Sequence, residues 1–123
     1  MTWCARVTSS IPNADEIRLR HMLDAGQEAV HSARVRGRSD LDHDRLWALG
    51  IVKCIEIIGE AASRVSPETR QRCPGIPWAQ VIGMRSRLFH AYFDLDLDQV
   101  WNAVTEDLPA LLADLQNILE PRP

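Results

Sequence analysis

Three side chains close together in the chain, Arg85, His90 and Tyr92, include the groups that RNA cleavage without a metal ion requires. Such cleavage needs a base that takes the 2′-hydroxyl proton, an acid that protonates the leaving 5′-oxygen, and a cation that stabilises the charge building up on phosphorus. Histidine suits both proton transfers because its ordinary pKa lies near neutral pH, and arginine suits the third because it stays protonated and presents several donors to phosphate. The spacing Arg-x4-His-x-Tyr is therefore a candidate ribonuclease motif.

Taken by itself this spacing is a weak signal, because an arginine and a histidine a few residues apart occur by chance in many helical proteins. Five residues on an ideal helix correspond to about 500°, so Arg85 and His90 would point roughly 140° apart. They can converge through the long reach of arginine, through a bend near 89–92 where the helix ends, or through a second copy of the chain. A two-fold dimer would supply two histidines, one for each proton transfer.

The elements that must position the motif are predicted to be helices. Apolar residues recur at helical spacing from about Asn13, and Gly37 is the expected C-cap of this first helix. A second helix, apolar almost all round, is predicted over 41–65 with Asp40 as its cap. Ser66, followed by a proline, should cap a short third helix.

A fourth helix is predicted to begin at Pro77 and to continue through WAQVIGMRSRLFHAY, which contains the motif. Asp96 or Asp98 should cap a last helix, which Pro109 should kink or divide because proline lacks the backbone donor. No stretch alternates with a period of two for long enough to predict a sheet. The predicted fold is all-α, an up-and-down bundle of about five helices.

Length and composition favour one ordinary globular domain. The chain has 123 residues, of which 46% are hydrophobic and 25% charged, and it has no run approaching the ~18 apolar residues of a membrane span. We expect a loose N-terminal tail over 1–13 and a single domain over 14–120. The first ten residues lack the apolar segment of a secretory signal, so a cytoplasmic protein without a membrane partner is expected.

Cysteine usage and charge exclude several kinds of site. The three cysteines form no CxxC pair, so neither a disulfide framework nor a structural zinc site is expected, and no metal or organic cofactor is predicted. The net charge of −3 argues against a protein that coats nucleic acid by bulk electrostatics. Locally, Glu60 could pair with Arg85 or Arg87, and Trp47, Trp78 and Trp101 are expected in the core.

Four blocks of sequence resemble the HEPN superfamily, and within it the HepT toxins that are encoded beside minimal nucleotidyltransferase antitoxins. The resemblance covers roughly 15–119, nearly the whole chain. The blocks are IIGEAA at Ile57–Ala62, IPW at Ile76–Trp78, IGMRSRLFHAYFDLD at Ile82–Asp96, and VW at Val100–Trp101. In combination, with these separations, they are a specific signal.

The resemblance implies a HEPN bundle that forms a homodimer with paired motifs facing a shared cleft, and an endoribonuclease that cleaves cellular RNA and restrains growth in a type VII-like toxin–antitoxin system. Arg85 and His90 match the catalytic pair of the family. Tyr92 matches the tyrosine that the partner antitoxin adenylylates. The family usually has Asn or another polar residue after the motif arginine, where this chain has Ser86, which can still hydrogen-bond a phosphate or orient a side chain.

Two alternatives remain open at this point. The chain could be a non-catalytic docking module that presents Tyr92 to a nucleotidyltransferase, since docking needs the same apolar faces. It could also be a bundle that binds a small nucleotide through the cleft at Arg85. Growth arrest and RNA cleavage separate the first alternative from a ribonuclease, and nucleotide titration separates the second.

Overall fold

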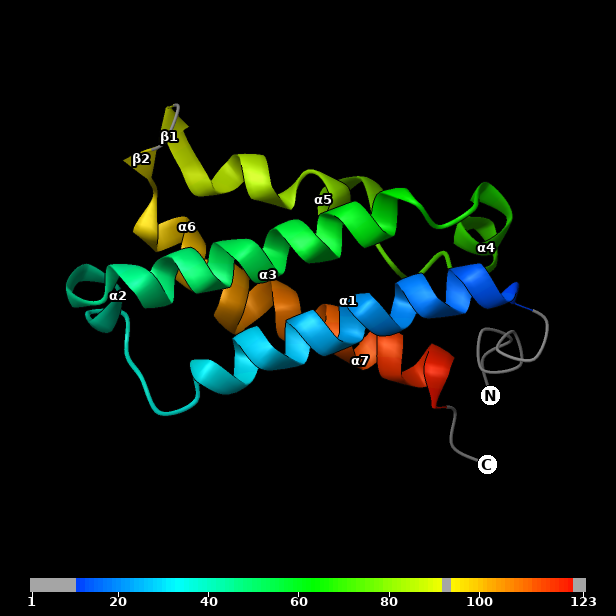
Figure 1. The fold of residues 1–123 in the computed structure, drawn as a ribbon, viewed down its shortest axis with the longest axis horizontal. Coiled ribbons are helices and arrows are strands. Elements are labelled where there is room, and N and C mark those ends of the chain that lie inside the picture. Colours follow the sequence, from blue (N-terminus) through cyan, green and yellow to red (C-terminus); the bar gives the residue numbers. More distant parts are fainter. Residues whose placement is uncertain (1–10, 92–93, 121–123) are drawn as a thin grey trace.

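The structure is a computed structural model that describes residues 11–91 and 94–120, and it shows a helical bundle with one short hairpin (Figure 1). The all-α prediction is confirmed. The elements in chain order are α1 (Asn13–Ser32), α2 (Asp40–His43), α3 (Arg45–Ser63), α4 (Pro67–Arg72), α5 (Trp78–Ile82), the 3-10 helix η2 (Met84–Leu88), β1 (Phe89–Ala91), β2 (Asp94–Leu95), α6 (Leu97–Asn102), the π-helical turn η3 (Ala103–Asp107) and α7 (Leu108–Leu119).

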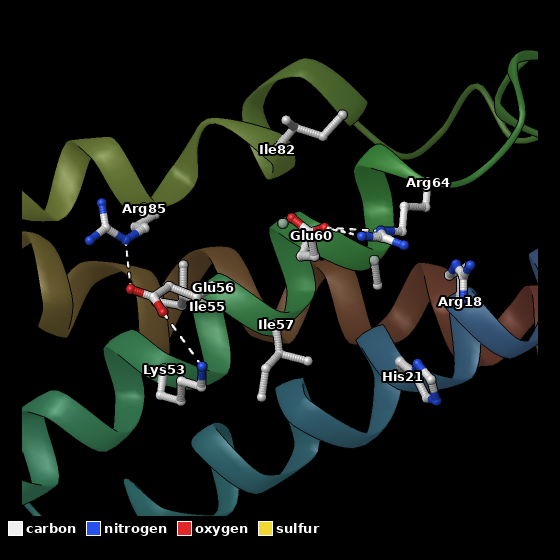
Figure 2. Close-up of a pocket in the computed structure, with 12 residues that line it drawn as sticks. Arg18, His21, Lys53, Ile55, Glu56, Ile57, Glu60, Arg64, Ile82 and Arg85 are labelled. Carbon is white, nitrogen blue, oxygen red and sulfur yellow. Dashed lines mark hydrogen bonds and ion pairs between the residues drawn. The ribbon is translucent and has the colours of Figure 1, made fainter.

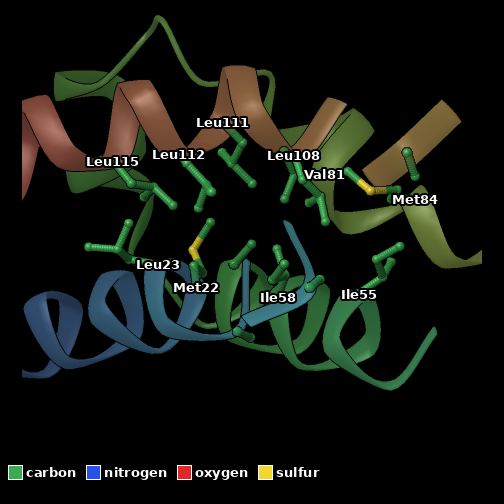
Figure 3. Close-up of a cluster of buried hydrophobic side chains, with 14 of the residues drawn as sticks. Met22, Leu23, Ile55, Ile58, Val81, Met84, Leu108, Leu111, Leu112 and Leu115 are labelled. Carbon is green, nitrogen blue, oxygen red and sulfur yellow. The ribbon is translucent and has the colours of Figure 1, made fainter. Parts of the chain in front are cut away.

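Three long helices, α1, α3 and α7, enclose the apolar core, and α1 packs against both of the others. Met22 of α1, Ile58 of α3 and Leu108 of α7 have no exposed surface. Figure 3 shows that Val81 of α5 and Met84 of η2 reach the same cluster. The segment that contains the motif is therefore attached to the core on one side, and its other side faces outward.

A glycine allows this segment to lie close to α3. A Cβ atom placed on Gly59 would stand 3.3 Å from the carbonyl oxygen of Ile82 at the end of α5, which is tighter than ordinary van der Waals contact. The neighbouring Ala61 and Ala62 are buried. The small residues of the GEAA block therefore set the distance between α3 and the motif segment.

Several predicted helix boundaries are confirmed. The side chain of Ser66 accepts a hydrogen bond from the Thr69 amide and caps α4, with the proline at the first helical position. The side chain of Asp96 accepts from the Gln99 amide at 3.2 Å and caps α6. The last helix is divided as predicted at Pro109, because α7 starts just before it and a wider π-helical turn precedes α7.

Two boundaries in the first half of the chain were predicted wrongly. The first helix ends at Ser32, before Gly37. The predicted helix over 41–65 is two helices, because the Asp44 side chain accepts from the Trp47 amide at 3.0 Å and caps a new helix there, whereas α2 has no side-chain cap. Residues 1–10 of the predicted tail lie outside the described residues. The first helix, α1, begins at Asn13, the last residue assigned to that tail.

Asp15 connects the first helix, α1, with the start of α4. Its carboxylate is buried on α1 and accepts from the Ser66 amide at 3.0 Å, from the Ser66 hydroxyl at 2.6 Å and from the Thr69 hydroxyl at 2.5 Å. Burial raises the pKa of this carboxyl, but the hydrogen bonds from Ser66 and Thr69 outweigh burial and hold it below the usual value. Asp15 therefore anchors the start of α4 to α1 as a carboxylate.

The largest correction concerns the predicted fourth helix. Instead of one helix over 77–92, α5 ends at Ile82, η2 follows, and His90 lies on a strand. The Asp96 amide donates to the Leu88 carbonyl at 2.7 Å and Phe89 pairs with Leu95, so these pairings replace the helical hydrogen bonds. The angle of a straight helix therefore does not separate Arg85 from His90.

Across the described ranges, no helix is long and apolar enough to cross a lipid bilayer.

Candidate active site

Arg85 lies on η2 with its side chain half exposed, and two contacts hold it in position. Its Nε donates to Glu56 Oε2 on α3 at 2.6 Å (Figure 2). Its guanidinium carbon lies 4.9 Å from the centre of the Phe89 ring. Lys53 approaches the other oxygen of Glu56 at 3.8 Å. Within the described part of the chain, the two terminal amino groups of Arg85 form no hydrogen bond, so they remain available to bind an anion.

His90 lies on β1 and its side chain is 60% exposed. Its Nδ1 is 3.6 Å from Asp96 Oδ2, while Asp96 Oδ1 accepts from the Gln99 amide. A carboxylate that is fixed by its own capping bond therefore faces one ring nitrogen, and the exposed ring can offer Nε2 to a substrate. Sequence reasoning identified Asp96 only as a cap, because its approach to His90 depends on the hairpin.

The structure brings Arg85 and His90 to one surface segment but does not bring them into contact. The strand pairing shifts between Phe89, on which Arg85 rests, and Ala91, so His90 is the extra residue of a β-bulge. In the described residues no hydrogen bond or ion pair joins the two. A single chain therefore exposes both groups without a direct interaction between them.

The supporting residues of the motif have more limited roles in this structure. The Ser86 hydroxyl donates to the Gly83 carbonyl at 2.8 Å, which stabilises the 3-10 turn beneath Arg85. Arg87 donates to the Gln80 carbonyl at 3.2 Å and is exposed. Tyr92 lies outside the described residues, so its predicted place in the site stays a prediction.

The predicted ion pair of Glu60 with Arg85 or Arg87 was wrong. Glu60 pairs with Arg64 at 2.9 Å, four residues later on the same helix, and Glu56 is the residue that binds Arg85. Glu56 lies one turn of α3 before Glu60. Which of the two glutamates faces Arg85 depends on how η2 packs against α3. Both acidic residues line the same groove.

This groove lies along α3 and has a volume of about 620 Å³. Charged and polar side chains from α1, α3 and η2 surround it, as Figure 2 shows. They are Arg18, His21, Lys53, Glu56, Glu60, Arg64 and Arg85. A second hollow, of about 390 Å³, lies on the other side of the Arg85–Glu56 pair and includes Leu49 and Phe89. Arg85 lines both the groove and this second hollow.

Other chemically capable groups are less suited to catalysis. Cys54 is partly buried, and both burial and the nearby Glu28 raise the pKa of its thiol. Cys73 is buried. Trp47 is buried, and Trp78 and Trp101 pack against the core, as predicted. Among the residues that the structure describes, no cluster of three or more His, Cys, Asp or Glu side chains is arranged to hold a metal ion.

Comparison with known proteins gives a consistent result. The family described as "Ribonuclease HepT-like" matches residues 11–118. A "Putative RNase" of Caldanaerobacter subterraneus subsp. tengcongensis is 31% identical over 104 residues, which cover 83% of this chain and 91% of that protein. A "Probable ribonuclease HepT" of Thermococcus cleftensis is 33% identical over 75 residues, covering 61% of this chain and 68% of the relative. No solved structure gives a significant match.

Proposed function

The chain belongs to the HepT-like ribonuclease family, and we propose that it is a metal-independent endoribonuclease that acts as a homodimer. The observation that supports this most directly is the segment from Arg85 to His90, which exposes a guanidinium oriented by Glu56 and an imidazole beside the carboxylate of Asp96. A guanidinium and an imidazole are the groups that phosphodiester cleavage by an internal nucleophile uses.

In this mechanism the ion pair with Glu56 orients Arg85 and leaves its terminal amino groups for the substrate. Nε stays on the carboxylate, and the terminal amino groups bind the scissile phosphate and stabilise the charge that develops on it. His90 takes the 2′-hydroxyl proton or protonates the leaving 5′-oxygen. The Asp96 carboxylate, with Oδ2 at 3.6 Å from Nδ1, would stabilise the protonated imidazole through its charge. Ser86 supports the turn that presents Arg85.

A second copy of the chain would complete the site. Leu46 and Leu49, 81% and 39% exposed, lie near the start of α3, at the end of the molecule where the hairpin stands (Figure 1). Leu49 also lines the hollow beside Arg85 and Phe89. A two-fold axis at this end would cover the leucines and bring the two copies of His90 near one cleft, one for each proton transfer. This arrangement removes the separation of Arg85 and His90 seen in one chain.

The chemistry of the product ends tests the proposal. Purified protein incubated with a single-stranded RNA in the presence of EDTA should yield 2′,3′-cyclic phosphate and 5′-hydroxyl ends, because the nucleophile is the substrate's own 2′-hydroxyl. The same RNA with 2′-O-methyl groups throughout should stay intact. Complete inhibition by EDTA, or products with 3′-hydroxyl and 5′-phosphate ends, would contradict the mechanism.

We further propose that the protein is the toxin of a type VII-like toxin–antitoxin pair and acts on RNA in the cytoplasm. A partner minimal nucleotidyltransferase would switch it off at Tyr92: the phenol oxygen attacks the α-phosphorus of ATP, pyrophosphate leaves, and AMP remains attached. An anionic AMP group two residues from His90 would repel an RNA phosphate.

This regulation is tested by co-expression with such a nucleotidyltransferase. We expect the intact mass to increase by one or more AMP units and RNA cleavage to be lost, whereas Tyr92→Phe should keep its unmodified mass and stay active. A wild-type protein that accepts AMP on Tyr92 but cleaves no RNA in its unmodified form would instead be the non-catalytic docking module.

A further inference from the structure

The groove along α3 concentrates positive charge on a protein of negative net charge. Four permanent cations line it, Arg18, Lys53, Arg64 and Arg85, against two carboxylates, Glu56 and Glu60, which leaves a balance of 4 − 2 = +2. The whole chain has a net charge of −3. A local excess of cations on an acidic protein is expected to attract an anionic ligand to that groove.

Two arginines of the groove are each paired with a glutamate of α3. Glu56 binds Arg85 at 2.6 Å and Glu60 binds Arg64 at 2.9 Å (Figure 2). The two acidic residues are four positions apart, about 6 Å along the helix axis. Each arginine keeps at least one terminal amino group without a hydrogen bond in the described residues.

Arg18 of α1 lines the groove at the end where Arg64 lies. Its Nε is buried and makes no hydrogen bond within the described part of the chain, and its charge acts on Asp15 only at longer range. Arg18 also contributes its positive charge to the groove. Figure 2 shows Arg18 and Arg64 at the same end, away from Arg85.

We infer that Arg18 and Arg64 form a phosphate-binding subsite for the RNA strand, next to the scissile phosphate at Arg85. This inference rests on the proposed ribonuclease function. Apart from the charged residues and His21, the lining residues are aliphatic or small: Ile55, Ile57, Gly59, Ala61 and Ile82. The groups proposed here to bind are guanidinium cations, so the subsite contacts phosphate and binds a strand without reading its sequence.

The test compares a long RNA with a dinucleotide that reaches only the site at Arg85. For the double variant Arg18→Ala/Arg64→Ala we expect at least tenfold weaker binding of a long RNA made uncleavable by 2′-O-methyl groups. The slope of log K against log salt should fall by about 1.4, for two phosphate contacts on a single strand. KM for a long cleavable RNA should rise while its kcat and dinucleotide cleavage stay unchanged.

A matched control has the same change of charge elsewhere. Arg20→Ala/Arg34→Ala removes two exposed arginines that do not line this groove, and it should bind RNA like the wild type. Circular dichroism melting checks both proteins, and Arg18→Lys/Arg64→Lys should recover part of the affinity because it keeps the charge. Long-RNA binding equal to that of the wild type, or an equal loss of dinucleotide cleavage, overturns the subsite.

The outcomes separate this inference from the proposed function. If the wild type cleaves RNA and the double variant behaves identically, the subsite is wrong and the ribonuclease stands. If the wild type cleaves nothing but the double variant loses long-RNA affinity, the subsite stands and the ribonuclease is wrong. If the double variant loses AMP affinity as much as RNA affinity, the groove binds a free nucleotide and the assignment to the strand is overturned.

Discussion

Replacement of His90 by alanine is expected to lower RNA cleavage about 10³-fold, within the range for removing a general acid–base group. The fold should be unaffected, because the side chain is 60% exposed and the nearby Asp96 keeps its capping bond to the Gln99 amide. The measurement is single-turnover cleavage of a labelled RNA, with the melting temperature as the check on folding.

Two companion variants strengthen this test. Asp96→Asn keeps a good capping residue but removes the negative charge beside the imidazole, so a smaller loss, on the order of tenfold, is expected. His31→Ala changes an exposed histidine on α1 and should leave cleavage unaltered. A folded His90→Ala protein that cleaves RNA at the wild-type rate would exclude the proposed mechanism.

The same variant tests the shared cleft. If one cleft needs the histidines of both copies, co-expressed wild-type and His90→Ala chains in equal amounts should retain about a quarter of the wild-type activity, since only dimers of two wild-type chains are active. Independent sites in each chain would retain about half. Differently tagged chains allow the mixed dimers to be isolated and assayed alone, and active mixed dimers would contradict the shared site.

Replacement of Arg85 by alanine is expected to lower cleavage by a similar factor, about 10³, because it removes the guanidinium proposed to stabilise the charge on the phosphate. Arg85→Lys should recover only part of the activity, since an ammonium keeps the charge but lacks the planar fork. The cost in stability should be below ~1 kcal/mol, because the ion pair with Glu56 is partly exposed. Cleavage rates and thermal melting are measured on the same preparations.

Glu56 and Arg87 supply the controls for this prediction. Glu56→Gln removes the charge of the carboxylate that orients Arg85, so a modest rise of KM with a nearly unchanged kcat is expected. Arg87→Ala removes a neighbouring cation that donates to the Gln80 carbonyl instead of facing Glu56, and cleavage should stay near the wild-type rate. Equal losses in Arg87→Ala and Arg85→Ala would show that general positive charge, rather than the placement of Arg85, matters.

The sequence by itself determined the features that depend on neighbouring residues. The all-α class, the caps at Ser66 and Asp96 and the division of the last helix at Pro109 follow from helical spacing, side-chain capping and the missing proline donor. These effects act within one or two turns of the chain. The sequence also singles out Arg85 and His90 as the candidate catalytic pair, through their types and their resemblance to the HEPN pattern, and their role stays a prediction.

Only the tertiary structure decided how those residues are presented. Arg85 meets Glu56 from 29 positions earlier, and the Asp96 amide pairs with Leu88 to end the predicted helix before His90. The groove likewise unites α1 with α3 and η2. Local propensity favours a helix through this segment, but hydrogen bonds and packing between distant segments stabilise a hairpin instead. Contacts of this range depend on the whole fold, so no spacing within one segment could reveal them.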